Sequence, residues 1–333
     1  MSKIIEEIEY KSPNAASEFL DALGRRQGQW QPNPTLWVFR GHSDADKYKL
    51  RPTALREDGV WLGTRHSTPE GRRNSEREQL NAEFSVIDSF IDYADRAGLL
   101  IPEDGQEHRT PEGYLRFKDV VDPALKGTGF WPPPNLLSWF ALAQHYRLPT
   151  RLLDWSYDPL SAAFFAAEGA AKKKDSEKPA FVAVWALSLE YVWNRYTAEW
   201  FNLDCWKLPN ANIETTIGNT LVRTVTAPRA SNPNLNAQQG LFTLVHKMHI
   251  DPGGPPFTDT LDDVLKAQVL RDQSTSTFAP KLPVMRHLKL AASHAPELMR
   301  LLDQEGVNSA KLFPGYEGAA KAVIERRLWD NEP

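Results

Sequence analysis

An arginine stands at the end of an apolar segment near the N-terminus. Arg40 follows the β-forming segment 37–39 and precedes Gly41. A guanidinium in such surroundings needs an anionic partner, because burying an unpaired charge is costly. A ligand phosphate would accept a bidentate pair of hydrogen bonds from it, and Gly41 would let a ligand or a backbone approach closely. The alternative is a salt bridge to a carboxylate such as Asp44 or Asp154.

The densest group of polar side chains lies in the segment AQHYRLPTRLLDWS at 143–156. It forms a short turn between two apolar helical segments, which would hold its polar groups rigidly. Its candidate binding residues are His145, Thr150, Arg151 and Ser156. The alternative is a hydrogen-bonded junction between a helix and a strand. Asp154 follows two leucines, so we expect its carboxylate to be partly buried, shared with Arg151 or His145, and mainly structural.

Two further segments carry polar groups beside glycine. Gln239 precedes Gly240 and an apolar run, where its amide could bind a sugar or a base edge, or simply cap a loop. Glu317 lies in LFPGYEG at 312–318, before the last helical segment. A carboxylate in a first helical turn is stabilised by the helix dipole. That structural role competes with a catalytic role for Glu317.

The elements that must position these groups are short and mixed in type. The segment 76–97 is predicted to be a long helix, because Ile87, Phe90, Ile91 and Ala94 share one face. A polar segment rich in Gly and Pro, 101–134, is expected to be a loop or an insertion. The pattern is α+β without regular βαβ alternation. The other expected helices are 15–24, 136–146, one opened by Pro159, 294–305 and 317–328, and the expected strands are 35–39, 180–187, 221–226 and 240–246.

Composition excludes several classes of protein. The 333 residues carry 39 basic and 43 acidic side chains, a net charge of −4, so no overall basic surface for nucleic acid is expected. One cysteine excludes an internal disulfide framework and a cysteine-cluster zinc site, and His246 with His249 is a weak metal candidate, so no metal is predicted. The acidic N-terminus and the short apolar runs predict a cytoplasmic protein without a membrane partner. Phosphate-binding P-loop, G-x-S-x-G and H-E-x-x-H motifs are missing from the sequence.

Four segments together resemble the FRG-domain family, whose name comes from an N-terminal F/Y-R-G sequence, here Phe39-Arg40-Gly41. The segment AQHYRLPTRLLDWSYDPLSAAFFA at 143–166 is similar to the family pattern A-Q-H-Y-G-L-P-T-R-L-L-D-W-T with its following P-L-x-A-x-x-F-A helix. It departs from the pattern at Arg147, where the family usually has glycine, and at Ser156, where threonine is common. Q-Q-G-x-F-T at 238–243 and LFPGYEG at 312–318 also resemble family features.

The resemblance implies a single FRG domain over 1–333, with its core at about 15–325. It also implies a role as a bacterial toxin or anti-phage defence effector. Such a protein would act on a protein or nucleic-acid acceptor and would have a neutralising antitoxin or a defence-system partner.

A weaker analogy connects these segments with ADP-ribosyltransferases, which implies a β core surrounded by helices. Arg40, then Thr150 or Ser156, then Gln239 follow the order of an arginine, a hydroxyl and an acidic or polar residue in those enzymes. Glu317 would supply the carboxylate that Gln239 lacks. The substrate would be NAD, with no metal, in an ADP-ribosyltransferase or NAD glycohydrolase reaction. Ser274 to Thr277 looks like the S-T-S motif of such enzymes but is expected to be a loop.

The alternative is a non-enzymatic module that binds a nucleotide, a nucleic acid or a phage component, and a third hypothesis is a scaffold without a ligand. Their discriminator is spatial. If Arg40, His145, Arg151, Asp154 and Gln239 meet in one cleft, the enzyme and nucleotide-binding hypotheses are favoured. If they scatter, or if Arg40 and Arg151 are each buried against a carboxylate, the scaffold hypothesis is favoured.

Overall fold

Strands from both ends of the chain meet in one sheet. The computed structural model describes residues 3–31, 33–47, 49–56, 75–105, 108–109, 117–126, 130–194, 220–226, 237–247, 250–275 and 281–329. Within these residues a seven-stranded sheet has the order β1-β7-β4-β2-β3-β6-β5, parallel at β1–β7 and antiparallel elsewhere. The predicted α+β class is confirmed. The strands are β1 (Ile5–Tyr10), β2 (Trp37–His42), β3 (Leu152–Ser156), β4 (Phe181–Ser188), β5 (Thr220–Val225), β6 (Gly240–Lys247) and β7 (Met285–Ala291).

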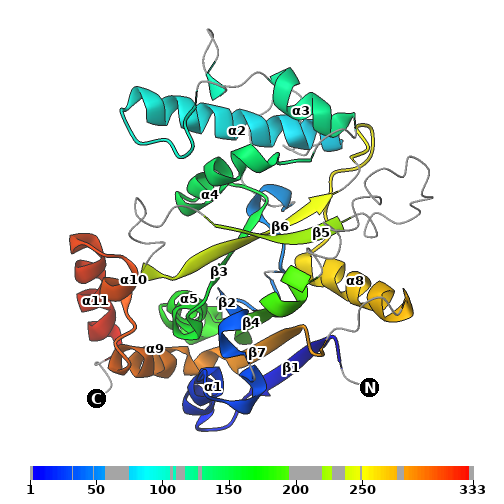
Figure 1. Cartoon of the computed structure of the whole chain (residues 1–333). Coiled ribbons are helices and arrows are strands. Elements are labelled where there is room, and N and C mark those ends of the chain that lie inside the picture. The colour runs from blue at the N-terminus through cyan, green and yellow to red at the C-terminus, as the bar shows by residue number, and fades with distance from the viewer. Residues whose placement is uncertain are drawn as a thin grey trace.

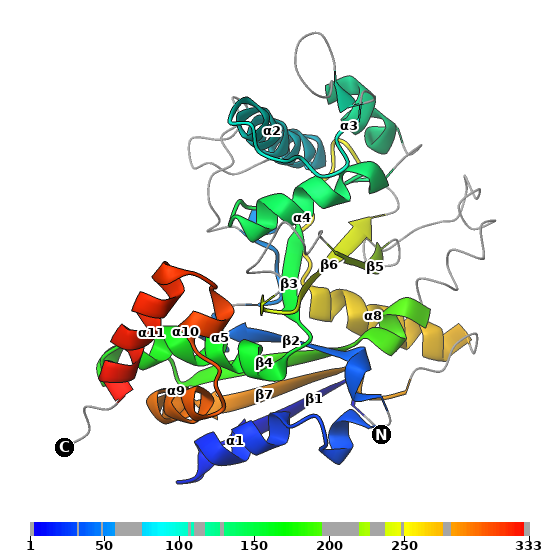
Figure 2. The same cartoon turned by 60° about the vertical axis from the view of Figure 1, so that its left-hand side comes forward.

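Helices gather at two ends of the molecule (Figures 1 and 2). At one end α1 (Ala15–Leu23), α5 (Pro159–Ala171) and α9 (Ala295–Gln304) share a core with β2, β4 and β7. At the other end α2 (Glu76–Arg96), α3 (Phe117–Leu125) and α4 (Leu137–His145) pack on β3, β5 and β6. The helix α8 (Leu261–Thr275) belongs to a third core with all the central strands. Two further helices, α10 (Ser309–Leu312) and α11 (Tyr316–Trp329), end the chain beside α5 and α9.

The first and last strands pair through complementary charges. In the parallel register Glu6 faces Arg286 and Glu9 faces Lys289. Glu6 forms an ion pair with Arg286, and a carboxylate oxygen of Glu7 lies 3.6 Å from Nζ of Lys289. Opposite charges on neighbouring strands stabilise their pairing. Neither strand reads as apolar in the sequence, which is why β1 and β7 are missing from the expected elements.

The segment expected to be a loop or insertion, 101–134, carries the helix α3 in its described part. Val121, Ala124 and Leu125 bury one face of this helix against α2. Pro123 stands inside α3, so the proline signal in this segment hides the helix from pattern analysis.

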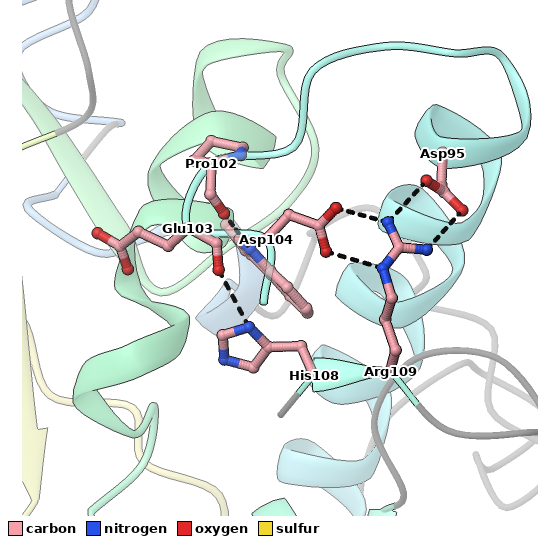
Figure 3. A network of polar contacts seen from close by, with 7 residues as sticks. Asp95, Pro102, Glu103, Asp104, His108 and Arg109 are labelled. Carbon is pink, nitrogen blue, oxygen red and sulfur yellow. Dashed lines mark hydrogen bonds and ion pairs between the residues drawn. The ribbon is translucent and has the colours of Figure 1, made fainter. Parts of the chain in front are cut away.

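Ion pairs fix the connection after α2. Arg109 donates from Nε to Oδ1 of Asp104 at 3.1 Å and from Nη2 to Oδ1 of Asp95, on α2, at 3.2 Å. Figure 3 shows this guanidinium between the two carboxylates, with the His108 ring directed at the main-chain oxygen of Glu103. From the other side, Trp139 of α4 donates from its indole to the carbonyl of Pro102 at 2.8 Å. These contacts tie α4, which leads into the polar central segment, to α2.

The sheet is weakest between β2 and β3. These strands pair at Phe39 and Ser156 alone among the described residues, whereas β3 pairs with β6 along its whole length. Beyond that point β3 runs away from β2 toward α4 (Figure 2). The two helical ends of the molecule meet across this gap, so polar side chains can enter the sheet here.

Three buried histidines stay neutral in the folded chain. Burial lowers the pKa values of His42, His246 and His287 to about 3. His287 stacks on Trp185 with the ring centres 3.8 Å apart, and both of its ring nitrogens lack a hydrogen-bond partner in the described residues. Nearby Lys289 adds to the lowering of the His287 pKa, and Asp262 opposes it.

These histidines make stability depend on pH. An unfolded histidine takes up a proton near pH 6.5, but a folded one does so only near pH 3, so the unfolded chain binds more protons between these values. The contribution of these histidines to the free energy of unfolding should therefore be constant above about pH 7 and fall as the pH drops below 6.5. Each histidine contributes about 2 kcal/mol of loss between pH 7.5 and pH 5.

His287→Phe tests this dependence, because phenylalanine keeps the stacking on Trp185 and removes one titrating group. In urea unfolding at the two pH values, the variant should be at least as stable as wild type at pH 7.5 and should lose less stability at pH 5. An equal loss in both proteins would mean that His287 does not contribute.

Candidate functional site

A cavity of about 660 Å³ opens where β2 and β3 part. Its walls come from β2, β3, the end of α4, α5, the start of β6 and the segment from α10 to α11. This volume lies in the range of small-molecule sites. Segments that are far apart in the sequence thus meet around one hollow. Its polar and charged lining side chains are Thr53, Arg40, Gln144, His145, Arg147, Asp154, Ser156, Gln238, Glu317 and Lys321.

Arg40 bridges the gap between the two strands. Its Nη1 lies 2.7 Å from Oδ2 of Asp154 and donates to the main-chain oxygen of Asp154, also at 2.7 Å. Its Nε donates to Nε2 of His42 at 3.2 Å, which requires the neutral form of that ring. The Arg40 side chain is 12% exposed and the Asp154 side chain 59% exposed, so the carboxylate is the open end of the pair.

Asp154 therefore has a different partner from the expected Arg151 or His145. Surrounding protein atoms alone would raise the pKa of this carboxyl, but the charge and hydrogen bond of Arg40 outweigh them and lower the pKa below its usual range. A hydrogen bond from Gln144 acts in the same direction. Asp154 is thus a fixed anion that faces the cavity.

A relay of hydrogen bonds orients this carboxylate. Thr150, fully buried, donates from its hydroxyl to Oε1 of Gln144 at 2.7 Å and accepts from the amide of Leu152. This fixes the Gln144 amide so that its nitrogen donates to Oδ1 of Asp154 at 3.2 Å. The sequence A-Q-H-Y-x-L-P-T therefore places Thr150 behind the cavity as a positioning residue for Gln144.

Arg151 points away from the cavity into the core. Its Nε and Nη2 donate to the two carboxylate oxygens of Glu83, on α2, at 2.6 and 2.9 Å. Trp131 donates to the same carboxylate at 2.7 Å, and Gln79 contacts it as well. The Glu83 side chain has no exposed surface. This buried group joins β3 to α2, as one carboxylate with four donor atoms around it.

Two motif glycines allow close packing of helices. A Cβ on Gly41 would lie 2.1 Å from the main-chain oxygen of Ala162, so β2 touches α5 directly at this point. A Cβ on Gly318 would lie 1.9 Å from the main-chain oxygen of Phe313. Gly41 thus meets the backbone of a helix, one of the two neighbours that the sequence allowed for it.

The glutamine segment before β6 supports the cavity floor. Ser156 donates to the main-chain oxygen of Gln238 at 2.6 Å, and the Gln238 amide donates to the carbonyl of Leu312 at 3.1 Å. Gln239 is exposed, has a φ of 49° and does not line the cavity. Its main-chain oxygen accepts from the amide of Tyr157.

Charged contacts hold α11 against α5. Lys321, on the cavity wall, lies 2.7 Å from a carboxylate oxygen of Glu168 and 4.8 Å from the centre of the Phe313 ring. A second lysine, Lys172, reaches Glu325 of α11 at 3.3 Å. Glu317 stands exposed in the first turn of α11 and lines the cavity. The fold therefore brings Glu317 to the same cavity as Arg40.

The structure divides the predicted site residues into two groups. Those that line the cavity are Arg40, Gly41, His145, Ser156 and Glu317. Thr150, Arg151 and Gln239 do not line it. Of the five residues of the spatial test, Arg40, His145 and Asp154 thus meet at the cavity, and Arg151 and Gln239 do not. Arg40 and Arg151 also each pair with a carboxylate, as the scaffold hypothesis expects. The polar lining residues absent from the prediction are Thr53, Gln144, Arg147, Gln238 and Lys321, and Asp154, expected to be mainly structural, also lines the cavity. Gln144 and Asp154 belong to the central motif, which was the available signal, whereas nothing in the sequence singles out Lys321.

The remaining sequence candidates lie elsewhere. His246 is buried and stacks on Phe130 with ring centres 5.7 Å apart, and His249 lies outside the described residues. Ser274 and Thr275 end α8, while residues 276 and 277 are also outside them. Within the described ranges, no three His, Cys, Asp or Glu side chains are grouped so that they could hold a metal ion. In the same ranges, no helix has the length and apolarity needed to cross a membrane.

Comparison with known proteins agrees with the central motif. The model of the FRG domain matches residues 106–175, which include α3, α4, β3 and α5. The matched segment contributes Gln144, His145 and Asp154 to the cavity, whereas Arg40 and Glu317 come from outside it. Neither the curated proteins nor the solved structures give a match. The predicted resemblance to the FRG-domain family is thus confirmed over residues 106–175.

Proposed function

We propose that this cavity binds NAD and breaks the bond between nicotinamide and ribose, as in ADP-ribosyltransferases and NAD glycohydrolases. The observation that carries the proposal is the meeting of two carboxylates, Asp154 and Glu317, with basic side chains in one cavity of nucleotide size. Carboxylates suit a ribose with developing positive charge, and cations suit the phosphates.

The chemistry needs no metal and no external oxidant. The C1′–N bond breaks, its electron pair stays on the nicotinamide nitrogen, and neutral nicotinamide leaves a ribose with oxocarbenium character. Water or an acceptor group then forms the new bond to C1′ and gives up a proton. Holding the reactants in this arrangement and stabilising the developing charge supply most of the rate enhancement.

Each carboxylate has a distinct role in this proposal. Asp154 is oriented by Arg40 and Gln144, and its lowered pKa keeps it ionised, so it opposes the positive charge on the ribose. Glu317, exposed on α11 and without such ties in the described residues, holds ribose hydroxyls and accepts the proton of the attacking group. Arg40 acts through Asp154 in this scheme, since their ion pair occupies its guanidinium.

The biological role follows from the resemblance to FRG-domain proteins. We propose a toxin or anti-phage effector that acts inside bacterial cells, with a protein or nucleic-acid acceptor if the reaction is transfer. An antitoxin or defence-system partner would hold it inactive. Consumption of NAD would then arrest the host cell.

The direct test is incubation of the purified chain with NAD labelled in the adenine part, with free nicotinamide measured by chromatography and the label followed in ADP-ribose and in macromolecules. Wild type should release nicotinamide, and Glu317→Gln should lower the rate by about 10²-fold, the usual contribution of a general base. The matched control is Glu305→Gln, an exposed glutamate after α9 that does not line the cavity, and its rate should equal wild type. A rate for Glu317→Gln equal to the control would remove Glu317 from the mechanism.

One observation favours the alternative of a nucleotide-binding module without catalysis. Arg40 and Asp154 already satisfy each other, as they would in a recognition site built only for shape and charge. In that case NAD would bind with a measurable Kd but stay intact in wild type and in every variant, with no inhibitory partner present.

A further inference from the structure

Among the helices that the structure describes, α2, α4 and α9 end with the same hydrogen-bond pattern. At the end of α2 the main-chain amide of Gly98 donates to the main-chain oxygen of Asp95, and the amide of Leu99 donates to the main-chain oxygen of Ala94. The last turn of α9 repeats the pattern, from Gly306 to Asp303 and from Val307 to Leu302. The end of α4 has the same pattern: the main-chain amide of Arg147 donates to the main-chain oxygen of Gln144, and that of Leu148 donates to the main-chain oxygen of Ala143. Such a pair of bonds is the Schellman motif.

The first residue after such a cap must adopt a left-handed conformation, which favours glycine because other L-residues are strained by their Cβ. Gly98 and Gly306 take this position with φ of 69° and 72°. The third helix places Arg147 there with φ of 64°. The chain therefore uses glycine at two of these ends and accepts strain at the third.

Location separates the strained end from the other two. Arg147 is exposed and lines the cavity, whereas Gly98 and Gly306 do not. Strained backbone conformations concentrate at functional sites, because selection for function outweighs their effect on stability. Glu103 and Gln239 also have positive φ and do not line the cavity, so strain alone does not mark a site. Arg147 is distinguished by combining a left-handed backbone with an exposed side chain on the cavity wall.

The guanidinium of Arg147 also differs from the two other cavity-lining cations, Arg40 and Lys321, because these two form ion pairs. Arg40 is paired with Asp154, and Lys321 is paired with Glu168. No ion pair or side-chain hydrogen bond of Arg147 occurs within the described ranges of the chain. A planar group with five donors at a cavity wall suits a phosphate, which it can bind through two parallel hydrogen bonds.

We infer that Arg147 binds the phosphate groups of a nucleotide in this cavity and sets the preference of this chain for a phosphorylated ligand. This inference rests on the proposed function only for the choice of a nucleotide, and it requires no bond cleavage. Arg147 thus takes the phosphate-binding role that the sequence predicted for Arg40.

The test uses ADP, inorganic pyrophosphate and adenosine as probes in calorimetric titrations at low salt. Arg147→Gly should weaken the binding of ADP and pyrophosphate by at least tenfold and leave adenosine binding unchanged, because only the phosphates contact the guanidinium. The same variant should melt about 2 °C higher than wild type, because glycine relieves the left-handed strain. A purely structural residue would not give opposite changes in affinity and in Tm.

Gly306→Arg is the matched control, since a Cβ at Gly306 meets nothing within 4 Å. It introduces the same strain at a helix end outside the cavity, so Tm should fall by about 2 °C with unchanged affinity for all three probes. Arg147→Asn separates charge from strain, because asparagine tolerates the left-handed region. Its affinity for ADP should match that of Arg147→Gly.

The inference would be overturned if the wild-type protein bound neither ADP nor pyrophosphate. It would also be overturned if Arg147→Gly bound both of them with the affinity of wild type. If ADP binding depends on Arg147 but NAD is never cleaved, the proposed reaction fails and the phosphate-binding role of Arg147 stands.

Discussion

Glu83→Ala is expected to lower the free energy of unfolding by about 3–5 kcal/mol, the usual loss when one partner of a buried ion pair is removed. The substitution leaves the Arg151 guanidinium, 5% exposed, without a counter-charge in the core. It also takes the acceptor from the indole of Trp131, which is 1% exposed. The contact between β3 and α2 depends on this carboxylate, so the end of the molecule that holds α4 should loosen first.

Urea unfolding of purified variants measures this loss. The control is Asp92→Ala, which removes the half-buried i,i+4 partner of the exposed Arg96 and should change stability by no more than about 0.5 kcal/mol. Replacing Glu83 and Arg151 together by leucine and methionine should recover most of the stability, since no buried charge then remains unpaired. A loss below 1 kcal/mol in Glu83→Ala would show that water reaches Arg151.

The elements with clear periodicity could be predicted, and those stabilised by distant charges could not. The helix α2 has one apolar stripe, and β4 is buried throughout its centre, so both signals are local. In contrast, β1 (IEEIEY) and β7 (MRHLKLA) interrupt the alternation of apolar and polar residues with the pairs Glu6-Glu7 and Arg286-His287, so the period-2 signal of a strand is weak. Each strand supplies charges opposite to those of the other. The helix α8 was also missed, because Gln268 and Asp272 are buried on its inner face and weaken its apolar pattern.

The candidate site could be located by its segments but not assigned residue by residue. The motif places Thr150, Arg151 and Asp154 within five positions, yet their side chains have different surroundings. Thr150 orients Gln144, Arg151 pairs with Glu83 in the core, and Asp154 faces the cavity. Side-chain direction depends on the parting of β2 from β3 and on Glu83 of α2, both far away in sequence. The positive φ of Arg147 is similarly invisible without the backbone.

The largest effect on activity is expected for Asp154→Asn, at about 10³-fold in the rate of nicotinamide release from NAD. Removing a preorganised charge beside a developing opposite charge produces losses of this order. Stability should fall far less, by no more than about 1 kcal/mol, because the Asp154 side chain is 59% exposed. Arg40 also keeps its bonds to the main-chain oxygen of residue 154 and to His42.

A graded series separates charge from orientation. Gln144→Leu leaves the charge of Asp154 and removes one of the hydrogen bonds that orient it, so the rate should fall by about tenfold with a normal Tm. Asp154→Glu restores the charge on a longer side chain and should recover part of the rate lost in Asp154→Asn. An Asp154→Asn protein that melts far below wild type but turns over NAD normally when folded would give the opposite assignment. The pair with Arg40 would then serve to close the gap between β2 and β3, and the charge that stabilises the ribose would have to come from Glu317.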